Sequence, residues 1–194
     1  MRVLLHACCG PCLLEPYDAL VAEHEVTVCY ANPNIHPVGE YRRRLETLRE
    51  YAVPRGIPVI EEAYEPAEWM RAVAGVEDDP AQRCRRCFAL RLGIAARRAV
   101  ALGMDAVATT LTVSPYQDAA AIREAGERVC AEAGVAYLDT DFHERYHDAT
   151  VRSRELGMYR QNYCGCLLSE IEAEQQRAER KAARHAARQA AREA

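Results

Sequence analysis

The sequence has no long apolar run, no excess of positive charge and no glycine-rich phosphate-binding loop. No segment approaches the roughly 18 apolar residues of a membrane span, so we expect no membrane segment. The first five residues are mostly apolar but too short for a signal peptide, which predicts a cytoplasmic protein. The formal net charge is −4. Any contact with RNA must therefore come from a local basic patch.

Short apolar runs alternate with helical patterns along most of the chain. Strands are predicted at residues 3–5, 26–30, 58–60, 106–111 and 135–138. Helices are predicted after Pro11 and over residues 41–52, 88–102 and 115–134, the last with a capping box from Ser114 to Gln117. This alternation predicts a Rossmann-like α/β fold with a doubly wound, mostly parallel sheet. Ligands of such sheets lie beyond the carboxyl ends of the strands.

The composition changes near residue 170. We expect one metal-binding domain over residues 1–169 and a charged helical tail over residues 170–194. The tail has no large apolar residue beyond Ile171 and is rich in Ala, Arg, Glu and Gln. A solvated helix is its simplest interpretation, and an arm that contacts RNA is the alternative.

Nine cysteines are present, which is many for a protein of a reducing compartment, where disulfides are rare. Cys29 and Cys130 stand alone in a predicted strand and a predicted helix, which indicates core cysteines. The other seven form three clusters, each beside a turn or a helix start: Cys8, Cys9 and Cys12; Cys84 and Cys87; Cys164 and Cys166. This clustering predicts one composite metal–sulfur site.

Seven thiols are too many for one tetrahedral zinc, whereas four suffice for a 4Fe–4S cluster. The remaining three would hold a second metal ion or act as redox thiols, and composition does not choose between these. Cys12 follows Pro11 at a helix start, where a thiol's pKa is expected to be lowered. Cysteines occupy the positions of phosphate-cradling glycines after the first strand, so nucleotide binding there is disfavoured.

The motifs resemble a known family, the cobalamin-independent epoxyqueuosine reductases of the QueH type. The similarity runs in order from about Arg2 to Ser169 and rests on six segments, residues 5–12, 30–37, 83–87, 109–111, 114–115 and 159–166, which read LHACCGPC, YANPNIHP, RCRRC, TTL, SP and YRQNYCGC. These motifs are long and unusual. The basic tail lies outside the similarity.

The resemblance implies the last step of queuosine synthesis, in which the epoxide on the cyclopentane ring of the wobble nucleotide of tRNA is reduced by two electrons. It also implies a 4Fe–4S cluster with an additional mononuclear iron. The implied cluster ligands are Cys8, Cys9, Cys84, Cys87, Cys164 and Cys166. The wider set of metal ligands adds Cys12, where some members have Asp, and Asp141. Which thiols bind the cluster and which bind the iron stays open.

Epoxide cleavage needs electrons, a Lewis acid on the oxygen and a proton donor. Tyr159, Tyr163 and His36 are the candidate catalytic donors, and Thr109, Thr110 and Ser114 are expected to face the same crevice. Recognition of an anticodon loop uses phosphate contacts and base stacking. The candidate phosphate contacts are Arg42, Arg43, Arg44, Arg83, Arg85, Arg86 and Arg160.

The expected partners are tRNA and an electron donor whose identity the sequence does not indicate. Two other classes of function are alternatives. One is a zinc- or RNA-binding module without catalysis. The other is an ATP-dependent tRNA sulfur-transfer enzyme, which would need a glycine- and serine-rich pyrophosphate loop after the first strand, and that loop is missing here.

Overall fold

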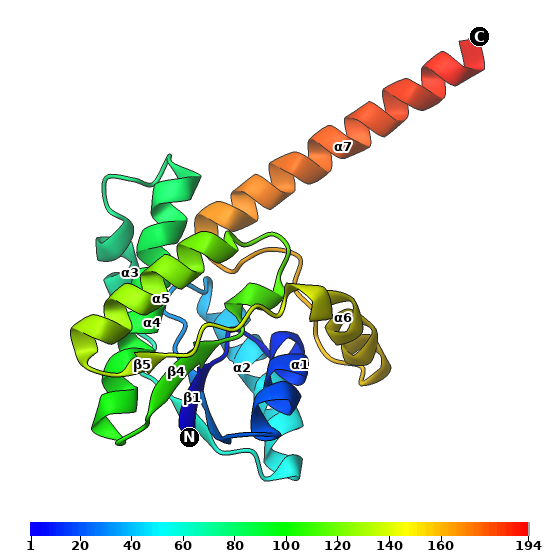
Figure 1. Cartoon of the computed structure of the whole chain (residues 1–194). Helices are drawn as coiled ribbons and strands as arrows, with labels where there is room; N and C mark the ends of the chain where they lie inside the picture. Colours follow the sequence, from blue (N-terminus) through cyan, green and yellow to red (C-terminus); the bar gives the residue numbers. More distant parts are fainter. Residues whose placement is uncertain (194) are drawn as a thin grey trace.

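The protein forms a three-layer α/β structure around one sheet (Figure 1). The computed structural model describes the backbone of residues 1–193 and the side chains of residues 1–184. All five strands are parallel, in the order β3-β2-β1-β4-β5. Their bounds are β1 Arg2–His6, β2 Glu25–Tyr30, β3 Val59–Glu61, β4 Ala106–Thr109 and β5 Ala136–Tyr137. The predicted Rossmann-like, parallel architecture is confirmed.

Helices cover both faces of the sheet, which explains why the central strand β1 is apolar at three successive positions, Val3 to Leu5. Val3 and Leu5 of β1 face a core formed with α1, α2 and α6, whereas Leu4 faces a core formed with α4 and α5. The helix bounds are α1 Gly10–Val21, α2 Val38–Ala52, α3 Pro66–Val73, α4 Pro80–Ala101, α5 Ala119–Ala133, α6 Tyr146–Glu155 and α7 Leu167–Glu193. Among the described residues, no helix is long and apolar enough to cross a membrane.

Two of the predicted boundaries in the segment between β4 and α5 are wrong. The strand ends at Thr109 rather than at residue 111, because the Thr109 hydroxyl accepts a hydrogen bond from the amide of Leu111 (3.2 Å) and a 3-10 turn follows. Ser114 does not cap the helix. Its hydroxyl accepts from the amide of Tyr116 (3.3 Å), and α5 begins at Ala119 with Asp118 as its cap.

Helix α4 begins earlier than the apolar stripe alone indicates. Asp79 caps it by accepting from the amide of Gln82 (3.0 Å), and Pro80 occupies the first turn. Cys84 and Cys87 therefore lie one turn apart near its N-terminal end, on one helix as predicted. The short helices α3 and α6 were not predicted from the sequence.

The C-terminal segment forms a long helix, α7, that projects from the body of the molecule (Figure 1). Its side chains are mostly exposed from Glu174 to Arg184. The first turns are attached to the domain, because Glu172 forms an ion pair with the buried Arg83 of α4 (2.6 Å). The part of the tail beyond Arg184 lies outside the described side chains.

Candidate metal centre

The first cysteine cluster lies between the carboxyl end of β1 and the start of α1. The Sγ atoms of Cys8, Cys9 and Cys12 all lie within 4.8 Å of one another. Those of Cys8 and Cys9 are 3.7 Å apart. All nine cysteines are free thiols. Three sulfurs at this separation form a group that can share one metal ion.

The Cys8 loop is fixed by its neighbours on both adjacent strands. The amide of Ala7 donates to the carbonyl of Cys29 on β2 (2.9 Å). The hydroxyl of Thr110, just after β4, accepts from the amide of Cys8 (3.2 Å) and donates to its sulfur (3.5 Å). His6 contacts Thr109 through Nδ1 (2.9 Å), and burial lowers the pKa of His6 to about 3. This imidazole is therefore neutral and structural at ordinary pH.

Within this cluster the pKa of Cys8 is lowered, whereas the pKa values of Cys9 and Cys12 are raised. Hydrogen bonds from Cys12 and then Cys9 hold the pKa of Cys8 well below its usual value. The same contact with Cys8 raises the pKa of Cys12. The expectation that the helix start lowers the pKa of Cys12 is wrong, because Cys12 donates its S–H to a neighbour that holds the charge.

The second group combines two cysteines of α4 with two from the loop before α7. Cys87 and Cys166 are buried in a small apolar cluster with Trp69 and Val73. Burial, together with charge on Cys164 and Cys166, raises the pKa of Cys84 to about 11. Burial likewise raises the pKa of Cys87 to about 12, with the same two neighbours contributing. These four thiols are therefore close enough to influence one another's ionisation.

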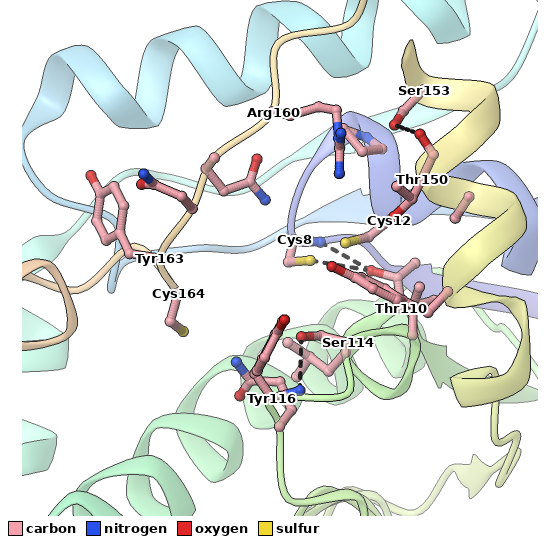
Figure 2. A pocket seen from close by; sticks show the side chains of 18 of the residues that line it. Cys8, Cys12, Thr110, Ser114, Tyr116, Thr150, Ser153, Arg160, Tyr163 and Cys164 are labelled. Atoms are coloured by element: carbon pink, nitrogen blue, oxygen red, sulfur yellow. Dashed lines mark hydrogen bonds between the residues drawn. The ribbon is translucent and has the colours of Figure 1, made fainter. Parts of the chain in front are cut away.

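The two groups also meet. The pKa of Cys164 is raised by burial, and charges on both Cys166 and Cys8 raise it further. Cys8, Cys12 and Cys164 line one pocket of about 500 Å³. Figure 2 shows Cys8 and Cys12 side by side and Cys164 on an opposing segment. The first and third clusters, which are separate in the sequence, thus meet at one pocket at the carboxyl ends of the strands, and the second cluster lies close to the third.

Arg44 holds the second group in place rather than contacting phosphate. Its side chain is only 1% exposed. It donates to the carbonyls of Cys164 (2.8 Å) and Tyr163 (3.4 Å) and pairs with Glu40 (2.6 Å). Arg83 is buried too, against Glu172 and the carbonyl of Glu77. The expectation of phosphate contacts is wrong for these two arginines, because their guanidinium groups are enclosed and already engaged.

The remaining candidate arginines reach the surface. Arg42 and Arg43 are exposed on α2, whereas Arg85 pairs with Glu124 and Arg86 donates to the carbonyl of Ala74. Arg160 lines the pocket beside the cysteines. Further residues that line this pocket are Tyr116, Gln176 and Arg180. The tail helix therefore contributes to the wall of the site.

Of the three candidate proton donors, Tyr163 lines the pocket. Its hydroxyl donates to the carbonyl of His36 (3.1 Å), and burial raises its pKa to about 12. The Tyr159 hydroxyl donates to Glu40 (2.8 Å), and its ring lies under Arg43 in a separate cavity of about 850 Å³. The ring of His36 packs against Trp69, with centroids 5.5 Å apart.

Asp141 and the hydroxyl residues occupy different places. Asp141 is exposed and accepts from the amide of His143 (2.9 Å) at the start of a 3-10 turn. It does not line the pocket among the residues whose side chains are described. Thr110 and Ser114 do line it, as the sequence predicts, whereas Thr109 is buried against His6.

Arg91 is a pocket residue that was not predicted from the sequence. It lies on α4 four residues after Cys87 and seven after Cys84, and it is fully buried. The helical spacing from the two cysteines is a signal that would have placed it on their face. Cys29 and Cys130, by contrast, lie in the apolar core as predicted.

Comparison with known proteins identifies the family of this chain. The family model described as epoxyqueuosine reductase QueH matches residues 3–172. The chain belongs to this family. The matched range contains all seven clustered cysteines, together with Arg44, Arg91 and Tyr163. The part of the tail beyond residue 172 lies outside it.

Individual relatives cover most of the chain. A protein of Streptococcus pyogenes serotype M1 named epoxyqueuosine reductase QueH is 37% identical over 175 residues, 85% of this chain and 69% of the relative. Proteins of the same name from Dehalococcoides mccartyi and Thermotoga maritima are 35% and 33% identical. These alignments cover 88% and 91% of this chain, and 93% and 94% of the relatives.

Proposed function

We propose that the protein reduces epoxyqueuosine to queuosine at the wobble position of tRNA, the last step of queuosine synthesis. The observation that carries this proposal is the convergence of the first and third cysteine clusters on one pocket, with Cys84 and Cys87 close enough to the third cluster to feel its charge, in a chain of the QueH family. Because its substrate is tRNA, we place its activity in the cytoplasm. The reaction consumes two electrons and two protons, and the epoxide oxygen leaves as water.

The donor set fits a 4Fe–4S cluster and an additional iron. Thiolates are the ligands of iron–sulfur clusters, and the three cysteine clusters supply seven free thiols. The surroundings fit as well, because the site contains two buried arginines, Arg44 and Arg91. Buried positive charges favour an anionic assembly of thiolates and cluster.

The grouping of the thiols supports a division of ligands. Cys84, Cys87, Cys164 and Cys166 number four, which is the set a cubane cluster requires. Cys8, Cys9 and Cys12 number three, which leaves a fourth position for substrate on a four-coordinate metal, as in catalytic metal sites. Cys8 and Cys12 face the pocket. Within this proposal Asp141, which caps a surface turn, is not a ligand.

When bound, the iron–sulfur centre supplies the electrons and a Lewis acid for the epoxide oxygen. The chain itself supplies the enclosure and the proton. Tyr163 is protonated at neutral pH, as any unshifted phenol is, and burial raises its pKa further, to about 12. It is the candidate donor that lines the pocket. Thr110 and Ser114 place further hydroxyl groups in the pocket to orient the cyclopentane ring.

The mouth of the pocket suits a splayed nucleotide of an anticodon loop. Tyr116 is 83% exposed there and presents an aromatic face for base stacking. Arg160 and Arg180 line the same pocket and offer two positive charges to backbone phosphates. Exposed Arg42 and Arg43 line a separate cavity and are further candidate phosphate contacts.

The decisive experiment is anaerobic purification, iron and sulfide analysis, and an assay on tRNA that carries epoxyqueuosine. We expect iron, acid-labile sulfide and conversion to queuosine with a chemical reductant. Tyr116→Ala should weaken tRNA binding by about 1–3 kcal/mol, the usual loss for one stacked base, without loss of iron. Met70→Ala, which shortens an exposed side chain of α3 outside this pocket, is the matched control.

Zinc in place of iron, with no conversion, would identify a metal-binding module and refute the proposal. Conversion that requires ATP would refute the electron-transfer chemistry. Equal tRNA binding by Tyr116→Ala and the wild-type protein would remove the stacking role while leaving the reaction in place.

A further inference from the structure

Arg91 differs from the other buried arginines of this protein. Arg44 and Arg83 are buried too, but each forms an ion pair, with Glu40 and Glu172 respectively. Arg91 is 1% exposed and has no ion pair with any carboxylate among residues 1–184. One of its nitrogens donates to Asn32 Oδ1 (2.6 Å), and its Nε has no hydrogen-bond partner.

A buried charge without a counter-charge is strongly unfavourable, so the position of Arg91 needs a negative group nearby. The side chain that accepts a hydrogen bond from it, Asn32, is neutral and also donates to the carbonyl of Ala7 (2.9 Å). This bridge attaches the guanidinium to the backbone immediately before Cys8. Arg91 therefore depends on the cysteine site for its compensation.

The positions of the thiols match this requirement. Arg91 lies one helical turn beyond Cys87 on α4 and lines the same pocket as Cys8 and Cys164. Arg91 thus lies close to thiols of both cysteine groups. Burial lowers the pKa of Arg91, but the charges of Cys87, then Cys164 and Cys8, outweigh that effect and raise it.

We propose that Arg91 is the fixed counter-ion of the metal centre, a positioning residue that favours the thiolate ligands and the reduced state of the cluster. This inference rests on the iron–sulfur part of the proposed function. Each ligand thiolate, and each electron taken from a low-potential one-electron donor, adds a negative charge to a site with little water. A permanent positive charge beside it stabilises the more negative state, and charge is one of the factors that set cluster potentials.

The test compares Arg91→Met, which removes the charge but keeps a long side chain, with Arg91→Lys, which keeps the charge. Arg97→Met is the matched control, because Arg97 lies on the same helix but is exposed to solvent. The reconstituted full-length proteins are titrated with dithionite under anaerobic conditions while cluster absorbance is recorded. Iron and sulfide contents are measured for each.

At a fixed ambient potential, we expect the ratio of reduced to oxidised cluster to fall about tenfold in Arg91→Met, which is about 59 mV for a one-electron couple. Arg91→Lys should recover most of the difference, and Arg97→Met should match the wild type. A midpoint potential in Arg91→Met equal to that of the wild type, with full iron content, would overturn the proposal.

A second measurement applies if Arg91→Met does not retain iron. Alkylation rates of the thiols are measured in metal-free protein at neutral pH, where a lost counter-ion should slow the reaction by making thiolates rarer. Slower alkylation in the Met variant, restored in the Lys variant, supports the proposal. Unchanged rates in a folded Arg91→Met variant would overturn it. Neither readout uses epoxyqueuosine, so a failure of the reductase assay alone leaves the two hypotheses distinguishable.

Discussion

Gly165, between Cys164 and Cys166, is the position where a single methyl group should disturb the metal centre most. Its φ is +125°, a conformation that side chains rarely adopt. A Cβ there would lie 2.9 Å from Nη1 of Arg44 and 3.0 Å from Cγ1 of Ile35. The simplest relief moves the Arg44 guanidinium away, which breaks its hydrogen bond to the carbonyl of Cys164.

The expected cost of Gly165→Ala follows from these two effects. Backbone strain of this kind costs about 1–3 kcal/mol. Loss of a hydrogen bond to a charged group costs about 1.5–3 kcal/mol more. A total of at least about 3 kcal/mol would lower Tm by roughly 6–12 °C in a protein of this size. Because Arg44 also positions the loop, we expect iron content to fall as well.

Gly134→Ala provides the matched control for this change. Gly134 also has a positive φ, +81°, but a Cβ added there would meet no heavy atom within 4 Å, and the residue caps α5 away from the pocket. We expect a loss of only about 1–2 kcal/mol and full iron content. Thermal unfolding and iron analysis of both variants test this expectation. Equal Tm losses, with full iron in Gly165→Ala, would refute the role assigned to Arg44.

Three further predictions concern the thiols and the tail. Cys87→Ala should lose iron, whereas Cys29→Ala and Cys130→Ala should retain metal and activity, because only the first removes a proposed ligand; iron content of the three variants decides this. Cys12→Asp should keep the cluster's absorbance and some turnover, and loss of the whole cluster would instead make Cys12 a cluster ligand. Deletion of residues 175–194 removes Arg180 from the pocket and should flatten the dependence of log tRNA affinity on log salt by roughly 0.7–0.9 per lost phosphate contact, with iron unchanged. A slope identical to that of the full chain would show that the tail makes no phosphate contact.

The local sequence pattern was sufficient to predict much of the fold, the shared helical face of two cysteines and the core positions of two others. Apolar runs separated by helical stripes predict the parallel α/β sheet, because each element's periodicity reflects which faces are covered. The spacing of Cys84 and Cys87 predicts one helical face, and the isolation of Cys29 and Cys130 indicates core residues. These inferences hold because they depend on neighbours a few residues apart.

The wrong prediction for the start of α5 arose because two local capping signals competed. Ser114 and Asp118 are both good helix caps in sequence, and the capping-box spacing favours the first. The structure uses Asp118. The 3-10 turn over Leu111–Val113 ends at Ser114, whose hydroxyl accepts a hydrogen bond from the amide of Tyr116 instead of capping α5. Which of two adequate caps begins a helix is decided by the path of the chain between β4 and α5.

The arginines show most clearly what only the tertiary structure decided. Arg42, Arg43 and Arg44 are consecutive and chemically identical, yet the first two are exposed and the third is enclosed against Cys164, 120 residues away. Arg91 is, in the sequence, one charge among many on a helix. Its burial beside the thiols depends on a hydrogen bond to Asn32 and on loops contributed by distant segments. The sequence by itself determined which residue types and helical faces the protein offers, because those follow from local spacing. The fold alone determined which charges lose their water and lie beside the clustered cysteines, because burial is set by contacts between segments remote in the chain.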